Sequence, residues 1–315
     1  ASQLAPIERA VRQFSRTLER NWWVTSYTAL SAHGPQPANR IANGLTSPVP
    51  PVSAVAEKRY DRFDFPRGAR PGTFLHSLFE GLDFAIQPGA ELDAWIDSRL
   101  QGIQLATDWQ PELWRPVLQQ WVADVVAAQL QPGLALRDIP AARCLAEMEF
   151  LLPVAELDAN RLNQLLRQQD ALSAQAHPLS FTTLQGMLKG FMDLVFEHQG
   201  RFYVLDYKSN HLGDSADAYG PDALQQAMIQ HRYDLQYQLY TLALHRYLAS
   251  RLPDYDYERH IGGVFYLFLR GTRSQGQGVF FTRPPRLLIE SLDLMFQGKP
   301  LPKTVEPAWE QGVLL

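Results

Sequence analysis

The chain has 315 residues, of which 46% are hydrophobic, and this is enough to bury a sizeable core in one large or two modest domains. Its 29 basic and 33 acidic residues give a net charge of −4, so the composition lacks the basic surplus of most nucleic-acid-binding domains and requires a local basic groove for such a role. A single cysteine excludes an intramolecular disulfide, a zinc ribbon and a four-cysteine iron–sulfur cluster, and no apolar run reaches the roughly 18 residues of a membrane span.

The first 64 residues carry no chemical motif. Apolar residues at positions 7, 11, 14 and 18 have the spacing of an amphipathic helix. The N-terminus lacks the basic-then-apolar layout of a signal peptide, so we predict a cytoplasmic protein without membrane contact. Prolines at 35, 37, 48, 50 and 51 indicate a linker over residues 33–59. We therefore assign residues 1–64 to a helix and a proline-rich linker that lead into a domain over 65–298.

Residues 65–80 form a glycine- and proline-rich loop that enters a helix, with Thr73 as the expected N-cap. His76 then falls in the first turn, where an imidazole can reach a site on neighbouring strands. A lone histidine among apolar neighbours is more often a satisfied core residue than a metal ligand. The residue pattern alone leaves both interpretations open.

Residues 90–131 have the periodicity of two helices that are broken near Pro111, and residues 144–153 are strand-like. Glu147 and Glu149 fall on one face of this strand. An ordinary half-solvated strand explains them, but beside an acidic hairpin one of them becomes a further acid near a metal.

The most informative segment is residues 187–210. Two runs rich in β-branched and aromatic residues flank Gln199-Gly200, which predicts a hairpin with a two-residue loop. Residues whose numbers sum to 399 then face each other, and Asp193 lies opposite Asp206 at a close, non-hydrogen-bonded position. Like charges that face each other destabilise a ladder, so such a pair implies a bound cation or a protonated acid.

The two-residue period places Lys208 on the same face as Asp206. Apolar neighbours are expected on that face too, namely Phe191, Val195, Phe202 and Val204. Two carboxylates suit a hard divalent ion, and a nearby lysine suits a metal-activated water that attacks a phosphate. The alternative is a surface hairpin with a chance aspartate–lysine pair, which the facing position of Asp193 makes less favourable.

The rest of the chain supplies the expected scaffold. Residues 222–250 have a helical pattern in which Gln236 and Tyr240 share a face, either orienting the lysine or a DNA phosphate or making a polar contact in the core. Residues 259–270 contain a continuous apolar run, as in a strand that is buried on both faces. We expect a closing helix over 287–296 and a flexible tail over 299–315.

Four segments together resemble the RecB-like nucleases, the C-terminal domains of the helicase–nuclease subunit of the RecBCD enzyme (exodeoxyribonuclease V). The segments are residues 70–80, 186–196, 205–210 and 233–247. The resemblance implies an α/β fold of the PD-(D/E)xK, restriction-endonuclease-like type, with a central mixed β-sheet flanked by helices. It also implies a Mg²⁺-dependent deoxyribonuclease that acts in double-strand break processing and recombinational repair, with Mn²⁺ or Ca²⁺ also able to occupy the site.

By motif, the resemblance also assigns roles to individual residues. It makes His76, Asp193, Asp206 and the backbone carbonyl of Tyr207 the metal ligands, Lys208 the catalytic lysine, Glu147 a further acid, and Gln236 and Tyr240 the paired residues of a helix motif. The implied partners are single-stranded DNA or unwound duplex ends, a helicase region of the same polypeptide, and RecC- and RecD-like subunits. The chain itself has no Gly-x-x-x-x-Gly-Lys-[Ser/Thr] phosphate loop. The rival hypothesis is a catalytically silent copy of the fold that guides DNA or docks a protein.

Overall fold

The computed structural model describes residues 23–27, 30, 60–181 and 183–301. The predicted N-terminal helix, the proline-rich segment 33–59 and the tail from residue 302 lie outside these residues. Within them, no helix has both the length and the apolar character that crossing a bilayer requires.

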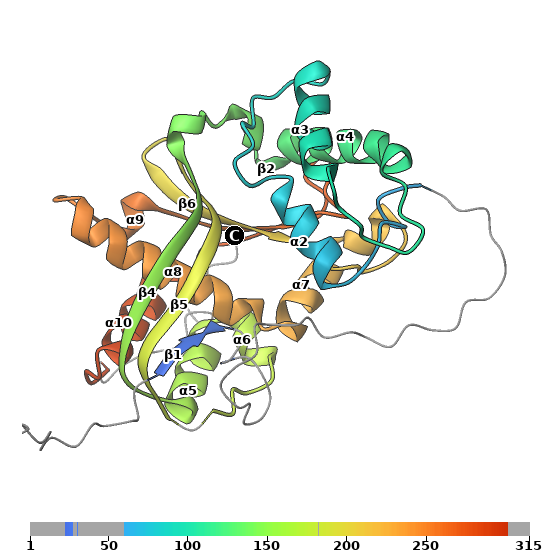
Figure 1. The fold of residues 1–315 in the computed structure, drawn as a ribbon. Coiled ribbons are helices and arrows are strands. Elements are labelled where there is room, and N and C mark those ends of the chain that lie inside the picture. Colours follow the sequence, from blue (N-terminus) through green and yellow to red (C-terminus); the bar gives the residue numbers. More distant parts are fainter. Residues whose placement is uncertain (1–22, 28–29, 31–59, 182, 302–315) are drawn as a thin grey trace, which may run out of the picture.

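A six-stranded mixed sheet forms the centre of the molecule, and β5 (Thr183–His198) is its longest strand. Five further strands complete it: β1 (Trp23–Ser26), β4 (Cys144–Asp158), β6 (Arg201–Lys208), β7 (Ile261–Phe268) and β8 (Val279–Thr282). A separate two-stranded ribbon joins β2 (Gln129–Gln131) to β3 (Leu134–Ala135). In Figure 1, β4 and β5 run side by side as one long twisted ribbon across the front.

The pairing of β5 leaves a gap that locates the site. Strand β4 is antiparallel to β5 along nearly its whole length, so it occupies one edge of β5. The other edge is shared: β1 pairs with residues 186–189, and β6 pairs with residues 194–198. Residues 190–193 of β5 therefore lie between two partners, and Asp193 stands where the β6 ladder stops.

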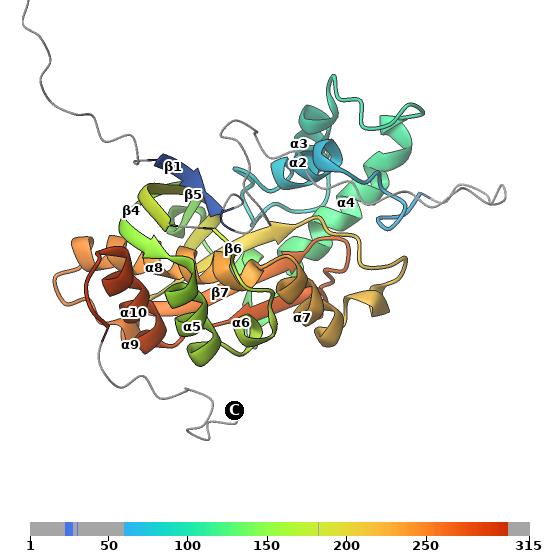
Figure 2. The same ribbon diagram turned by 90° about the horizontal axis from the view of Figure 1, so that it is seen from below.

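Helices cover both faces of the sheet, which Figure 2 shows as layers on opposite sides. One face carries α2 (Ala69–Ser77), α3 (Ala90–Leu100) and α4 (Pro111–Ala127). The other carries α5 (Ala159–Gln169), α6 (Ala171–Gln175), α7 (Pro221–Gln230), α8 (Tyr233–Arg251) and α10 (Arg286–Phe296), with the short α9 (Tyr257–His260) before β7. The predicted α/β fold with a central mixed sheet between helices is confirmed.

Strand β7 shows why two cores form. All eight of its residues are buried. Val264 and Tyr266 pack in the core on the α8 side, whereas Phe265 and Leu267 pack in the core on the α2 side. Because successive side chains of a strand point to opposite faces, a strand covered on both faces needs a continuous apolar run, as predicted.

Two predicted helix boundaries were wrong. Helix α2 begins at Ala69, after Gly68 with φ 115°, and Thr73 lies inside it with its hydroxyl donating to the Ala69 carbonyl. His76 consequently lies in the last turn and not the first. The single helix expected over residues 222–250 is two helices, because Arg232 adopts a left-handed conformation with φ 56° between them.

Candidate active site

The β5–β6 hairpin has the predicted register. The observed pairs run from His198 with Arg201 to Leu194 with Leu205. Both loop residues, Gln199 and Gly200, have positive φ values of 51° and 79°, as a type I′ turn requires. Continuing this register by one residue brings Asp193 opposite Asp206.

The ladder itself ends one residue before the two aspartates. The backbone N–H of Tyr207 donates to the Asp193 carboxylate at 2.8 Å, so a side chain takes the place of a strand carbonyl. Met192 packs in the core on the α8 side and Leu194 in the core on the α2 side, although residues two apart normally share a face. The strand thus rotates at Asp193. This rotation leaves Phe191 44% exposed, so its predicted place on the apolar face beside Asp206 was wrong.

Glu147 lies opposite Asp193 on the other neighbouring strand. The flanking pairs, Ala146 with Leu194 and Met148 with Met192, fix this position. Glu147 has a φ of 51°, in the left-handed region that non-glycine residues seldom adopt. Both strands therefore depart from regular geometry at the same point, next to the acidic residues.

Each aspartate has a cationic partner. The nearest atoms of His76 and Asp193 are 3.3 Å apart, and the Lys208 ammonium lies 2.6 Å from the carboxylate of Asp206. Burial opposes ionisation of Asp193, but the bond and charge of His76 outweigh it and lower the pKa of Asp193. Burial raises the pKa of Asp206, which the charge of Lys208 only partly offsets. The pair therefore ionises unequally, with Asp193 losing its proton first.

The pKa values of both basic partners are raised. Burial disfavours the charged form of His76, yet the neighbouring Asp193 and Asp206 outweigh it and raise the pKa of His76. Burial likewise acts against the Lys208 ammonium, but the charge of Asp206 keeps its pKa above the usual value. Lys208 is therefore a buried cation at neutral pH.

Helix α8 closes a ring of hydrogen bonds around Asp206 and Lys208, which we call the polar ring. Lys208 donates to the side-chain oxygen of Gln236 at 2.8 Å, and the amide nitrogen of Gln236 donates to the Tyr240 hydroxyl at 2.7 Å. The Tyr240 hydroxyl donates in turn to Asp206 at 3.1 Å. The side chains of Gln236 and Tyr240 are buried, and their hydrogen bonds go to the lysine and aspartate of this ring.

Four residues on the other side of Asp206 are more open, and we call them the outer group: His76, Glu80, Glu147 and Asp193. Burial, followed by the charges of Asp193 and Glu80, raises the pKa of Glu147. Glu149, the alternative acid, instead lies 3.0 Å from Lys189.

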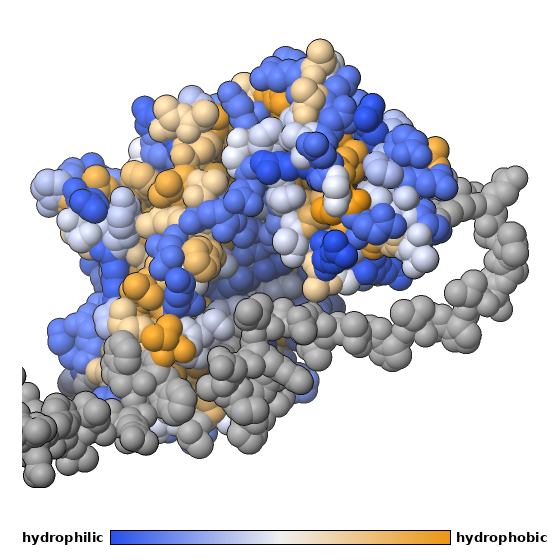
Figure 3. Space-filling model, viewed as in Figure 1, coloured by the Kyte–Doolittle hydropathy of each residue, from blue (hydrophilic) through white to orange (hydrophobic). Residues whose placement is uncertain are grey.

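The sequence analysis missed Glu80 as a member of this group. Its spacing of four residues from His76, about one helical turn, was the signal that could have indicated it. Figure 3 shows a hydrophilic hollow between the β4–β5 ribbon and the lobe of α2 to α4.

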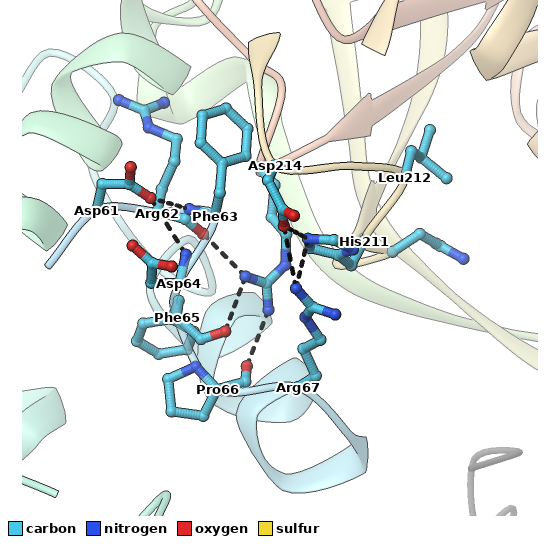
Figure 4. A network of polar contacts seen from close by, with 12 residues as sticks. Asp61, Arg62, Phe63, Asp64, Phe65, Pro66, Arg67, His211, Leu212 and Asp214 are labelled. Atoms are coloured by element: carbon cyan, nitrogen blue, oxygen red, sulfur yellow. Dashed lines mark hydrogen bonds and ion pairs between the residues drawn. The ribbon is translucent and has the colours of Figure 1, made fainter. Parts of the chain in front are cut away.

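Arg270 connects the lobe of α2 to α4 to the end of strand β6. Its buried guanidinium donates to the backbone carbonyls of Arg62, Phe65 and Pro66 ahead of α2, and to that of Ser209 directly after β6. Burial lowers the pKa of Arg270 to about 10. Figure 4 shows the segment from Asp61 to Arg67 beside His211 and Asp214, with Arg67 near both side chains. The sequence analysis assigned no role to Arg270, which is the last residue of the segment 259–270.

The donor set suits a divalent cation in its chemistry. Two facing carboxylates, a third acid and an imidazole are hard oxygen and nitrogen donors. One oxygen of the buried Asp206 carboxylate accepts no hydrogen bond from the described residues. Among the described residues, no three His, Cys, Asp or Glu side chains already surround a common point as ligands. The carboxylates of Asp193 and Asp206 instead pair with His76 and Lys208, respectively. The role of the Tyr207 carbonyl stays a prediction.

The amino-acid sequence of this chain is similar to those of known proteins. Residues 56–293 match the model of the PD-(D/E)XK nuclease superfamily. The chain is 47% identical to the RecBCD enzyme subunit RecB of Escherichia coli K12 over 298 residues, which are 91% of this chain and 24% of that protein. It is 37% identical to the RecB subunit of Haemophilus influenzae, over 90% of this chain and 24% of the relative, and 32% identical to that of Mycobacterium tuberculosis H37Rv, over 92% and 30%.

The chain thus spans about a quarter of the length of the Escherichia coli and Haemophilus influenzae relatives. The family match begins ahead of α2 and ends inside α10, so it includes the hairpin, the polar ring and the outer group. Nucleases of this superfamily generally use divalent metal ions. The resemblance to RecB-type nuclease domains is confirmed, and the chain belongs to the PD-(D/E)XK nuclease superfamily.

Proposed function

We propose that this chain is a Mg²⁺-dependent deoxyribonuclease domain that hydrolyses DNA phosphodiester bonds. One observation carries the proposal: two facing aspartates lie at the end of a strand ladder, and one of them shares a closed hydrogen-bonded ring with a buried, charged lysine. The pairs that the two acids make with His76 and Lys208 do not require the acids to face each other. Facing acids repel, and a cation that both acids bind explains their position.

Asp193, Asp206 and His76 are the side chains that would hold the ion, with the Tyr207 carbonyl beside them and Glu147 adjusting their charge. A bound Mg²⁺ supplies Lewis-acid polarisation of a phosphate oxygen and a more acidic water. Lys208, held by Gln236 and Asp206, presents an ammonium that stabilises negative charge as the phosphate is attacked. Because Tyr240 and Gln236 fix both ends of this unit, the lysine needs no reorganisation during the reaction.

The relatives suggest the biological setting. They are named as RecB subunits of the RecBCD enzyme. We propose that this domain works in a longer polypeptide with a helicase region and with RecC- and RecD-like subunits, on unwound DNA ends during double-strand break processing and recombinational repair in the cytoplasm. A silent copy of the fold would be expected to have lost an aspartate or the lysine, and this chain retains all three.

Cleavage of linear single-stranded DNA with Mg²⁺ tests the proposal. Asp206→Ala and Lys208→Ala should each lower the rate at least ~100-fold, because each removes a charge at the reacting phosphate. Lys189→Ala is the matched control, since this lysine lies on the neighbouring strand and pairs with Glu149. Thermal unfolding would verify that the variants fold. Cleavage at the wild-type rate by both site variants would contradict the catalytic assignment and favour the silent module.

A further inference from the structure

Three aromatic rings form a stack that runs from the surface to the polar ring. The ring of His231 lies 5.3 Å from that of Tyr233 with an interplanar angle of 22°, and Tyr233 lies 5.8 Å from Tyr266 at 21°. Tyr266 is buried and its hydroxyl donates to Gln236, whereas His231 is exposed. The stack therefore ends at the surface in an accessible flat ring.

The catalytic lysine lies against the same stack. The Lys208 ammonium is 4.0 Å from the ring centroid of Tyr233 and 5.1 Å from that of Tyr266. The His231 ring and the Lys208 ammonium therefore both contact the ring of Tyr233.

An unusual backbone conformation creates the stack. In a continuous helix, residues two apart do not face each other. The left-handed Arg232 between the two rings places them on the same side, and its buried guanidinium is held by Asp234 and the carbonyl of His177. A non-glycine residue in this region costs free energy and persists only where its surroundings hold it, often at functional sites.

Asn210 fixes the edges of the two outer rings. Its side-chain oxygen accepts a hydrogen bond from the Tyr233 hydroxyl at 3.1 Å, so its amide nitrogen faces His231 and donates to Nε2 at 3.1 Å. Asn210 lies two residues after Lys208 and couples the ring orientation to the catalytic strand. Burial, with the charge of Lys208, lowers the pKa of His231, so the outer ring is neutral at physiological pH.

We propose that the exposed face of His231 is a stacking platform for an unpaired nucleobase of the strand being cleaved. The inference rests on the proposed nuclease function and deepens it. Every base has a flat aromatic face, so stacking tolerates any sequence. A base inside a duplex already has neighbours on both faces, so the platform selects single-stranded DNA or a frayed end over intact duplex.

Binding in EDTA separates this inference from the cleavage chemistry. The 315-residue chain is titrated into a single-stranded oligonucleotide with 2-aminopurine at internal positions, and affinity and fluorescence quenching are recorded. His231→Ala should weaken binding roughly tenfold and abolish most of the quenching. His231→Phe, which keeps a flat ring but loses the Asn210 bond, should retain most of both. Tyr247→Ala, an exposed ring on α8 about 20 Å from Tyr233, should bind like the wild type.

Three results would overturn the platform. They are unchanged affinity and quenching in His231→Ala, equal weakening by the alanine and phenylalanine variants, and an equal loss of affinity of His231→Ala for a blunt duplex. The last result would assign the histidine to the backbone and not to a base. Failure of Asp206→Ala and Lys208→Ala to reduce cleavage would instead refute the proposed function, whatever the fluorescence shows.

Discussion

The polar ring and the outer group flank the same two strands but differ in how completely they are bonded. Asp206, Lys208, Gln236 and Tyr240 are at most 8% exposed, and hydrogen bonds or ion contacts join them into a closed circuit. The outer group has no such circuit, and Glu147 is exposed. Rigid positioning and access for ligands are therefore divided between the two sides of Asp206.

This division has a physical basis. Buried polar groups are costly unless all are satisfied, so a ring in the core must be complete and is then rigid. Groups that bind a cation must keep donor capacity open, which costs less near solvent, where the outer group lies. Asp206 belongs to both sides, because one carboxylate oxygen accepts from Tyr240 and the other accepts no hydrogen bond from the described residues. We expect substitutions in the ring to affect stability and catalysis together, and substitutions in the outer group to affect metal binding with little loss of stability.

Apart from the loss of Asp206 or Lys208 itself, the largest effect is expected from breaking the ring at Gln236. Gln236→Leu removes the acceptor of Lys208 and Tyr266 and the donor to Tyr240. Because a buried charged donor is left with fewer partners, the free energy of unfolding should fall by about 1–3 kcal/mol. The turnover number should fall roughly 10- to 100-fold, with a smaller change in the Michaelis constant. Chemical denaturation and steady-state cleavage measure the two quantities.

Gln226→Leu provides the control for Gln236→Leu. Gln226 is an exposed glutamine on the adjacent helix α7. Its replacement should leave stability within about 0.5 kcal/mol of the wild type. A Gln236→Leu protein with full turnover would show that Lys208 does not depend on the ring for its position.

The sequence predicted the parts of this comparison that depend on local rules. Loop residues Gln199 and Gly200 set the hairpin register, which then placed Asp193 opposite Asp206 without any information on distant contacts. The spacing of four residues predicted that Gln236 and Tyr240 share a helix face. The same spacing could not decide between lysine orientation and a phosphate contact, because burial of the helix depends on the whole fold.

Long-range hydrogen bonds explain two predictions that were wrong, the place of Phe191 on β5 and the single helix over residues 222–250. The rotation of β5 at Asp193 depends on a bond from its side chain to the backbone of Tyr207 on another strand. The helix break at Arg232 depends on the buried Asp234 and on the carbonyl of His177, which is 55 residues away. No local propensity marks an arginine as a helix break. Both deviations lie at the site, where local rules and tertiary contacts conflict.

An intermediate effect is expected from His76→Ala in the outer group. The pKa of His76 is raised in the folded, metal-free protein. A raised pKa stabilises the folded state below the unfolded value of about 6.5, and this contribution is lost as pH rises through the raised folded value. Thermal unfolding in EDTA should therefore show the wild type losing its advantage over His76→Ala as pH increases through that window.

The same proton should compete with the metal at His76. Mg²⁺ binding by the wild type, measured by calorimetry, should tighten as pH rises through the raised pKa, because the imidazole must lose its proton to become a ligand. His76→Ala should bind more weakly and with less dependence on pH. His198→Ala, beside the hairpin loop, serves as the control. Equal pH dependence in His76→Ala and the wild type would exclude His76 as a ligand.

The smallest effect is expected from Glu147→Gln. The pKa of Glu147 is raised by burial and by the charges of Asp193 and Glu80, so its neutral form relieves repulsion. Without metal, the glutamine variant should be more stable by at most about 0.5 kcal/mol, and it should bind Mg²⁺ a few-fold more weakly. Glu149→Gln lies two residues along β4 and loses only its pairing with Lys189, so its Mg²⁺ affinity should not change. If both variants bound Mg²⁺ equally, Glu147 would belong to the strand surface and the outer group would lose its third acid.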